Sequence, residues 1–397
     1  MLEVNQKILL VTETPPGTPN GFGVTLKCLF KNIDHDVVYT DAAFSKHGDL
    51  EGFTLAQVPY HRSIKHFPAF LLGRIPEWRS LYSKKWLKEN SIANYTKVYA
   101  FVYSTACLLY ATWIAKQKNI SLLVHLADHS EEFEQHNVAR ILRNCSKLIC
   151  ISKEMRSKYK SMLGRKNIDV LHNGAEDRCF QIAPPSPPPF AEKNPFILCF
   201  LGGLFSHLHG NCIEDILEAV SQIRKQIPWF EFHLYGQRQP EGFLEERLKQ
   251  SGVTHHGIVM PLEKKYSIME RAHCFVVPSS FNLKNHRDYR FSFPTKLPEI
   301  IASGRSIISY GPSDTSTNRL LESHKIGTGI YNRSVKELVF SLTNIVNRFT
   351  ERNSDICSND SIIGEVFSAK EIRKVQISWQ SQHQTNHQDR KSYLVQF

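Results

Sequence analysis

Three patterns that would place a protein in a special class are missing from this 397-residue sequence. The nine cysteines include no Cys-x-x-Cys pair and most lie in apolar runs, so we expect reduced, buried thiols rather than disulfides or a zinc site. The uncharged run at 99–115 contains three Ser or Thr side chains and is shorter than the ~20 apolar residues of a membrane-spanning helix. The first six residues lead directly into an apolar run, which predicts no secretory signal and a cytoplasmic protein.

The composition does not suggest a fibrous or largely disordered chain. With 41% hydrophobic and 22% charged residues, the sequence has the balance of a globular protein long enough for two domains. The formal net charge of +11 suits an anionic partner. It does not distinguish a membrane surface from a nucleic acid.

Strand-like and helix-like segments alternate along the first half of the chain. This alternation predicts a parallel sheet with helices on both faces, and ligands of such sheets bind at the carboxyl ends of the strands. We expect helices at 24–31 and 106–116. The expected strands are 7–13, 36–39, 97–103, 122–126, 147–151 and 168–171.

The loop after the first expected strand is rich in glycine and precedes a helix. Gly21 and Gly23, on either side of Phe22, would let backbone N–H groups approach an anion or a sugar closely. The alternative is a turn that only needs a positive φ angle. The dinucleotide fingerprint G-x-G-x-x-G is absent, because Gly23 is followed by Val-Thr-Leu.

A group of titratable residues follows the expected strand at 122–126. Asp128 is a candidate to hold or deprotonate an acceptor hydroxyl, and His129 is the competing candidate. Alternatively, Asp128 or Ser130 caps the helix that follows. His125 lies within the apolar strand, so we expect a hydrogen-bonded core histidine rather than a metal ligand.

Segment 61–88 carries seven Lys or Arg side chains against one Glu, with five aromatic residues between them. Such a segment can rest on an anionic membrane surface. Nucleic-acid binding would need a similar footprint, but no recognisable module accompanies it, so we expect no nucleic-acid partner. A solvated helix whose aromatic side chains face the core is the third interpretation.

A proline-dense stretch near 183–190 predicts a semi-rigid linker, and the strand and helix pattern restarts after it. The expected strand 196–201, Gly202-Gly203 and an expected helix at 212–226 form a second candidate phosphate loop. We expect further strands at 231–235, 273–277, 306–310 and 326–330, and further helices at 242–250 and 369–378. The segment 380–390 is a polar tail.

The stretch at 291–304 gives the most specific chemical prediction. A short helix is expected at 298–303, with Pro298 in its first turn and Gly304 at its end. Its free N–H groups favour a phosphate, Lys296 adds a positive charge, and the Glu299 carboxylate offers acceptors for a pair of sugar hydroxyls. Phosphate plus ribose indicates a nucleotide. The alternative is an ordinary solvated helix face.

Together these motifs resemble the GT-B glycosyltransferases, in particular the retaining bacterial group 1, or family 4-like, class. The second domain of that class carries Pro-x-Lys-Leu-x-Glu followed by Ala-x-Gly. The matching residues here are Pro294, Lys296, Leu297, Glu299, Ala302 and Gly304, with weaker matches at Pro278-Ser279, 149–155 and 172–174.

The resemblance implies two doubly wound Rossmann-like α/β domains facing a cleft. The corresponding division is 1–183 for an acceptor domain, 184–195 for the linker, 196–360 for a nucleotide-sugar domain, and 361–397 for a returning helix and tail. It also implies a donor-binding set drawn from two loops of the second domain. That set is Gly203, His209, Arg290, Ser292, Pro294, Thr295, Lys296 and Glu299.

Two departures from the family pattern weaken part of this assignment. Relatives usually place Arg and Lys where Leu204 and His209 stand, and often Glu where Phe291 stands. The missing positive charge could be replaced by His207, His209, Arg287, Arg290 and Lys296 if the loop 281–292 folds over the site. His207 and His209 could instead bind a metal, but no carboxylate or Cys lies nearby in sequence, so we expect a metal-free site.

The resemblance implies an enzyme that moves a sugar from a nucleotide-sugar to a hydroxyl of a glycan or polyprenyl-linked acceptor, with retention and without a cofactor. We expect it in cell-surface polysaccharide synthesis, in the cytoplasm or peripheral on the inner membrane face. The alternatives are a non-catalytic partner subunit, suggested by the departures, and a nucleotide-sugar epimerase.

Overall fold

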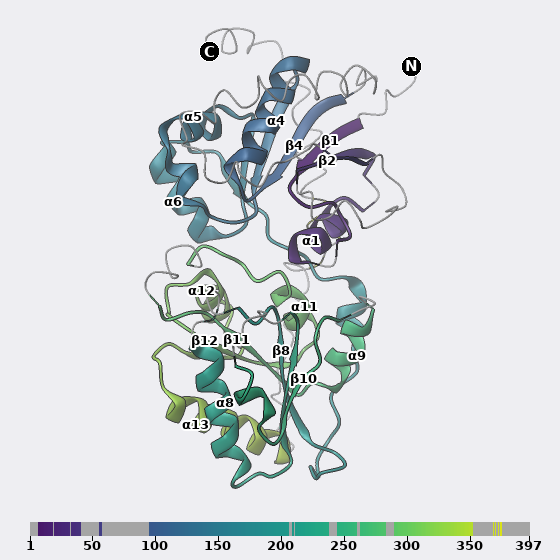
Figure 1. The fold of residues 1–397 in the computed structure, drawn as a ribbon, viewed down its shortest axis with the longest axis vertical. Helices are drawn as coiled ribbons and strands as arrows, with labels where there is room; N and C mark the ends of the chain where they lie inside the picture. The colour runs from purple at the N-terminus through teal and green to yellow at the C-terminus, as the bar shows by residue number, and fades with distance from the viewer. Residues whose placement is uncertain are drawn as a thin grey trace.

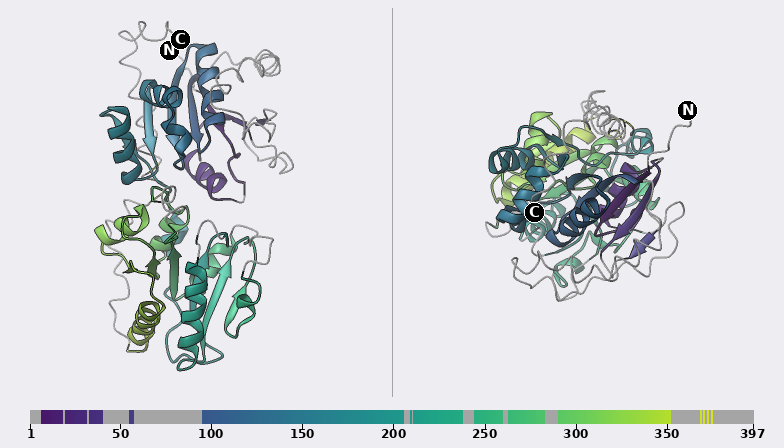
Figure 2. Two further views of the ribbon diagram at one scale, coloured as in Figure 1. Left: turned by 60° about the vertical axis from the view of Figure 1, so that its left-hand side comes forward. Right: turned by 90° about the horizontal axis from the view of Figure 1, so that it is seen from above.

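The structure is a computed structural model, and it describes most of the chain. The described residues are 7–18, 20–31, 33–40, 55–57 (backbone only), 95–205, 209, 211–237, 244–259, 263–282, 290–351, 368, 370, 372 and 374. They form two α/β domains that lie one above the other along the long axis (Figures 1 and 2). The α/β class and two-domain GT-B architecture expected from the sequence are confirmed.

The first domain is built on a parallel sheet with seven strands in the described residues. The strand order is β3-β2-β1-β4-β5-β6-β7, so the direction of winding reverses between β1 and β4. The strands are β1 (Lys7–Thr12), β2 (His35–Tyr39), β3 (Leu55–Gln57), β4 (Tyr95–Val102), β5 (Ser121–Leu126), β6 (Lys147–Cys150) and β7 (Ile168–Val170).

Helices cover both faces of this sheet because its strands are apolar on both sides. Leu9 and Val11 of β1 pack into the cluster with helices α4 (Thr105–Lys118), α5 (His136–Asn144) and α6 (Lys153–Leu163). Ile8 and Leu10 face the other way, toward α1 (Gly21–Leu29). Burying each such side chain contributes roughly 1.5–3 kcal/mol before the entropy cost of folding. Two 3-10 turns, η3 (Glu131–Glu134) and η4 (Asp177–Gln181), complete the connections.

The second domain repeats this plan with six parallel strands in the described residues, in the order β10-β9-β8-β11-β12-β13. Helices α8 (Cys212–Arg224) and α13 (Val335–Thr350) pack on one face of the sheet. Helices α9 (Lys264–Arg271), α11 (Leu297–Ala302) and α12 (Ser316–Ser323) contribute to the cluster on the other face. The strands are β8 (Phe196–Leu201), β9 (Phe230–Tyr235), β10 (Val253–His255), β11 (Cys274–Pro278), β12 (Ser306–Tyr310) and β13 (Thr328–Ile330).

The proline-rich stretch is held against the second domain. His273 Nε2 lies 3.0 Å from the Ser186 carbonyl oxygen, and the buried Arg305 guanidinium donates to the Ala183 carbonyl. Phe190 packs in the core cluster of the second domain. The chain therefore crosses between domains before Ala183, near η4.

The described residues between 368 and 374 contact the first domain. Ser368 forms an isolated parallel bridge with Ala175, and Ile372 is buried in the cluster on the α1 side of the first sheet. Lys370, Ile372 and Lys374 are helical. The remainder of the expected helix and the polar tail at 380–390 lie outside the described residues.

Most element boundaries differ from expectation by one to three residues, and two differences have a clear local cause. Helix α1 begins at Gly21 rather than at residue 24, because the Asn20 side chain accepts from the Gly23 N–H and caps the helix earlier. The prediction of a helix at 242–250 is wrong for the described residues 244–250. Residues 247–249 form only a 3-10 turn, and Leu244 has a left-handed φ of 64° that interrupts an α-helix.

Candidate functional site

The segment that leads into α11 lies where the two domains meet (Figure 1). Helix α11 runs from Leu297 to Ala302, one residue earlier than expected, with Pro298 in its first turn and Lys296 as its N-cap. Gly304 has a φ of 66°, as expected of a glycine that ends a helix. All six residues of α11 are buried, so the interpretation of this helix as a solvated surface face was wrong.

Glu299 is held by a lysine that the motif does not include. Its Oε1 lies 2.5 Å from Nζ of Lys265 on α9, and the two side chains are 7% and 16% exposed. Burial raises the pKa of Glu299, and the Lys265 ammonium opposes that shift. The carboxylate in turn raises the pKa of Lys265. In its ionised form, the Glu299 carboxylate can accept hydrogen bonds from hydroxyl groups.

Lys296 stands beside this pair at the start of α11. Burial lowers the pKa of Lys296, whereas the nearby Glu299 opposes the shift. Two ammonium groups thus lie close to the helix start that was expected to attract a phosphate. The sequence motif gave no sign of Lys265, because this residue is 34 positions from Glu299 in the chain and belongs to another helix.

Residues 291–295 connect the second domain to the carboxyl edge of the first. Ser292 Oγ donates to Asp128 Oδ1 at 2.5 Å, and Ser152 Oγ donates to the Phe291 carbonyl at 2.8 Å. The Phe293 ring stacks on His172 with centroids 5.2 Å apart. The structure therefore brings candidate groups of both domains together around one short segment.

Thr295 completes this contact by lying against Gly21 at the start of α1. A Cβ atom at Gly21 would lie 2.7 Å from Thr295 Oγ1, so a larger residue would force the two elements apart. Gly23 is also closely packed, since a Cβ there would lie 2.7 Å from the Thr18 backbone nitrogen. Both glycines have negative φ, so close approach rather than an unusual backbone angle requires them. Phe22 stacks on Tyr103 with ring centroids 4.5 Å apart.

Asp128 follows β5 and reaches the contact between domains. Its Oδ1 accepts from its neighbour's backbone N–H, that of His129, at 2.9 Å, in addition to Ser292. The capping role falls to Ser130, whose side chain accepts from the Glu132 N–H at the start of η3. The expectation that strand β5 ends at Leu126 is confirmed.

His129 is buried rather than open to the cleft. Its Nδ1 lies 3.0 Å from the Tyr159 hydroxyl and its Nε2 lies 3.4 Å from Glu134 Oε1. Burial and the positive charge of Lys158 lower the pKa of His129 to about 4, so the imidazole is neutral at pH 7. Both ring nitrogens of His129 thus have partners, whereas Asp128 contacts the second domain through Ser292.

His125 is the hydrogen-bonded core histidine that the apolar strand predicted. It is 1% exposed, and its ring nitrogens lie 2.9 Å from the Tyr99 hydroxyl and 3.0 Å from the Leu171 carbonyl oxygen. Burial lowers its pKa to about 3. The ring nitrogens of both His125 and His129 therefore have partners within the first domain.

Phe291, where relatives often carry Glu, is an aromatic contact at the domain interface. Its ring lies edge-on to His129 with centroids 5.1 Å apart. Two cations lie near the same ring, Lys158 Nζ at 5.1 Å and the Arg290 guanidinium at 5.7 Å from its centroid. A carboxylate is nevertheless bound to this segment, because Asp128 of the first domain accepts a hydrogen bond from Ser292.

The second glycine loop follows β8. Gly203 is closely approached by the Phe205 ring, and its carbonyl oxygen lies 3.1 Å from His209 Nε2. Leu204, where relatives place Arg, is a fully buried core residue. This loop therefore supplies backbone groups and one imidazole, and its other expected histidine, His207, lies outside the described residues.

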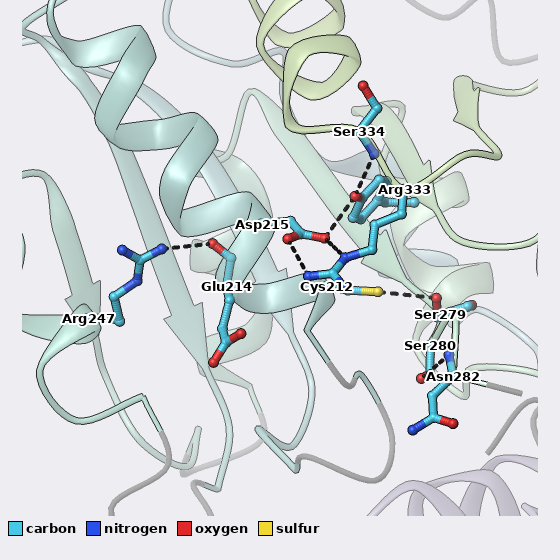
Figure 3. Close-up of polar contacts among 10 residues, drawn as sticks. Cys212, Glu214, Asp215, Arg247, Ser279, Ser280, Asn282, Arg333 and Ser334 are labelled. Carbon is cyan, nitrogen blue, oxygen red and sulfur yellow. Dashed lines mark hydrogen bonds and ion pairs between the residues drawn. The ribbon is translucent and has the colours of Figure 1, made fainter. Parts of the chain in front are cut away.

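The N-terminus of α8 above this loop is held by a polar network that the sequence did not reveal (Figure 3). Arg333 donates to Asp215 through Nε at 2.7 Å and through Nη2 at 2.9 Å, and the Tyr310 hydroxyl donates to the same carboxylate at 2.9 Å. Cys212 Sγ lies 3.3 Å from the Ser279 carbonyl oxygen. These contacts fix the start of α8 relative to β11, β12 and β13.

Arg290 lies at the same edge of the second domain, and its side chain forms an ion pair with Asp314. Its Nε lies 3.2 Å from Asp314 Oδ2, and its carbonyl oxygen accepts from the Ser316 N–H at the start of α12. Arg287 and the basic segment 61–88 lie outside the described residues. Within the described part of the chain, no three His, Cys, Asp or Glu side chains converge as metal ligands, and no helix is long and apolar enough to cross a membrane.

Comparisons with known proteins agree with this architecture. Residues 195–347 match the family model described as glycosyl transferases group 1. No curated protein sequence matches the chain. The structure of HepE from Anabaena in complex with UDP is similar with a TM-score of 0.67 and 16% identity, over 95% of this chain and 100% of that chain.

Two further solved structures are similar over nearly their whole length. A glycosyltransferase from Rickettsia africae has a TM-score of 0.64 and 12% identity, covering 95% of this chain and 98% of that chain. WaaG, a glycosyltransferase involved in lipopolysaccharide biosynthesis, has a TM-score of 0.56 and 15% identity, covering 94% and 95%.

Two doubly wound α/β domains that face one another define the GT-B class of folds. The chain has this fold, and residues 195–347 of its second domain are similar to the group 1 glycosyl transferases.

Proposed function

We propose that the protein transfers a sugar from a nucleotide-sugar donor, of the UDP-sugar class, to a hydroxyl group of a glycan or lipid-linked acceptor. The observation that carries this proposal is the meeting of Lys296, Glu299 and Asp128 around the segment 291–295. One domain offers groups for a phosphate and a ribose, and the other offers a carboxylate for a hydroxyl. The solved HepE complexes contain UDP and UDP-glucose, which supports uracil as the base of the donor.

The proposed chemistry uses the two domains for different parts of the reaction. The start of α11, with Lys296 and the glycine loop after β8, stabilises the diphosphate that leaves. Asp128 accepts the proton of the attacking hydroxyl, and the contact between the domains excludes water from the reacting atoms. Retention at the anomeric carbon and independence from a metal are parts of this proposal and rest on the family resemblance.

The binding half of the proposal is tested with Glu299→Ala. We expect UDP to raise the melting temperature of the wild-type protein more than GDP, CDP, ADP or dTDP does. In the variant, the ribose hydroxyls lose their acceptor in a buried site, at a cost of ~1–3 kcal/mol of binding free energy. Calorimetric titration at matched pH checks this, and equal UDP affinity in both proteins contradicts the assigned donor site.

The catalytic half is tested with Asp128→Asn. The amide keeps an oxygen for Ser292 and the His129 N–H but cannot take a proton, so UDP binding should persist while turnover falls by about 10²–10⁴-fold. Ser130→Ala is the control, because it removes only the cap of η3. Unchanged turnover in Asp128→Asn rules out this residue as the base.

Two other functions remain as outcomes of the same experiments. Phe291 and Leu204 stand where relatives carry charged residues, which favours a non-catalytic partner subunit if no nucleotide binds. Donor turnover excludes that function. A donor that is epimerised or hydrolysed without an acceptor would instead indicate a nucleotide-sugar epimerase.

The acceptor and its location complete the proposal. We place the reaction in cell-surface polysaccharide synthesis at the cytoplasmic face of a membrane, supported by the net charge of +11 and the basic, aromatic segment 61–88. Reversing the charges of Lys84, Lys85 and Lys88 should reduce cosedimentation with anionic liposomes. Unchanged cosedimentation contradicts a membrane role for this segment.

A further inference from the structure

The residue beside Glu299 that the family motif does not include is Lys265. It projects from α9, whereas Glu299 lies in α11, and their charged atoms are 2.5 Å apart. With exposures of 16% and 7%, both side chains are largely removed from water. An ammonium and a carboxylate in such a site hold one another in a fixed geometry.

The pair leaves the carboxylate able to bind more than the lysine. A carboxylate has about four acceptor positions on its two oxygens, and Lys265 contacts Oε1. The remaining positions can accept two neighbouring hydroxyl groups. A protonated carboxyl group would instead carry a donor and fewer acceptors.

Building on the proposed function, we propose that Lys265 is a positioning residue that orients and keeps ionised the Glu299 carboxylate, and so gives the donor site its selectivity for the 2′- and 3′-hydroxyls of a ribonucleotide. Lys265 acts through Glu299 in this proposal. It does not itself touch the phosphates.

Several charged or titratable groups from neighbouring elements influence Glu299. Lys265 of α9 lowers the tendency of Glu299 to take up a proton, as does Lys296 at the start of α11, and Glu176 in the segment before η4 opposes them. Cys179 of η4 also interacts electrostatically with Glu299. Burial alone favours the neutral carboxyl group, so loss of the closest ammonium should leave Glu299 protonated over a wider pH range.

The surroundings of Lys265 hold its ammonium at this position. Nζ lies 5.0 Å from the centroid of the Tyr266 ring, and the Tyr266 hydroxyl donates to Glu176 Oε2 at 2.9 Å. The Arg178 guanidinium lies 4.3 Å from the centroid of the same ring. The segment that crosses from the first domain therefore packs against α9 close to the pair.

The test compares binding of UDP and 2′,3′-dideoxy-UDP by calorimetry at several pH values between 6 and 9. The wild-type protein should prefer UDP by about tenfold or more over the whole range, because each lost hydroxyl leaves a buried acceptor unpaired. In Lys265→Met the preference should fall to about threefold or less at pH 6 and recover as the pH rises and Glu299 ionises. Lys265→Arg should restore the preference at pH 6.

Two variants separate positioning from general damage to the domain. Lys264→Met removes the same charge from the adjacent, exposed position of α9 and should leave the preference unchanged. In the double variant Lys265→Met/Glu299→Gln the buried pair becomes neutral, and adding Lys265→Met to Glu299→Gln should change the preference no further. A merely structural role of Lys265 would weaken both nucleotides equally and would give no pH dependence.

The outcomes distinguish this inference from the proposed function. A wild-type protein that binds neither nucleotide overturns the proposed function and this inference with it. A wild-type protein that prefers UDP, together with a Lys265→Met variant that keeps the full preference at pH 6, overturns the role of Lys265 alone. Should the single variant not fold, equal preferences of Glu299→Gln and the wild-type protein overturn it instead.

Discussion

Each domain buries a glutamate near the carboxyl edge of its sheet, and the two side chains are held in different ways. Glu299 of the second domain forms an ion pair with Lys265. Glu13, directly after β1 of the first domain, is 4% exposed, and its Oε1 accepts from the Tyr103 N–H and from the Ser104 N–H and hydroxyl at 2.7–3.1 Å. Its Oε2 is buried and makes no hydrogen bond among the described residues.

Burial raises the pKa of both carboxyl groups, and the two groups differ in the partners that oppose this shift. Burial outweighs the hydrogen bonds of Glu13 and raises its pKa to about 7. Glu299 has a cation at 2.5 Å, so it can remain charged and offer acceptors to a ligand. The hydrogen bonds of Glu13 connect the end of β1 to the start of α4, so this side chain has a structural role.

The largest expected effect on stability comes from breaking the ion pair between Glu299 and Lys265 in the second domain. Glu299→Gln leaves the Lys265 ammonium buried without its carboxylate, and we expect a loss of ~3–5 kcal/mol in the free energy of unfolding. Lys265→Met/Glu299→Gln should recover most of this loss, because a neutral pair needs no counter-ion. Urea unfolding at pH 7 measures both, and a single variant as stable as the wild-type protein means that the pair contributes nothing to stability.

The next effect concerns the pH dependence of the first domain. Because the folded-state pKa of Glu13 is about 7 and the unfolded value is 4.5, the folded state holds its proton more tightly. Its contribution to stability is therefore lost as the pH rises from about 4.5 to about 7 and stays lost above that range, by ~3 kcal/mol in total.

Glu13→Gln keeps an oxygen for the Ser104 donors and removes the titration. The variant should be more stable than the wild-type protein by up to ~3 kcal/mol at pH 8, and the gain should vanish below about pH 4.5. Thermal unfolding across this pH range is the measurement. A constant difference at every pH would show that Glu13 does not titrate in this way.

The smallest expected effect sharpens the same comparison. Ser104→Ala removes one donor to Glu13 and the N-cap of α4, and we expect a cost of ~1 kcal/mol. The pH at which the Glu13 contribution is lost should also move upward, because less hydrogen bonding favours the neutral acid. Ser130→Ala, which removes another cap away from Glu13, should leave that pH unchanged.

Several features of the site could be predicted because they depend on neighbours in the chain. The apolar run before Asp128 placed this residue at the end of β5, and the order of Pro298, Glu299 and Gly304 predicted α11. The apolar strand also identified His125 as a core residue. Asn20 was overlooked as a cap, although its polar side chain before a glycine-rich turn was a readable signal for the earlier start of α1.

By itself the sequence determined the alternation of strands and helices, the two glycine loops and the polar residues at strand ends, since these follow from periodicity and local backbone preference. Only the tertiary structure decided that Lys265 pairs with Glu299 and that Ser292 meets Asp128, 164 residues away. It also decided that Phe291 fills a contact between domains. Such pairings depend on how helices cross over each sheet and how the domains pack. The local pattern of residues does not determine that geometry.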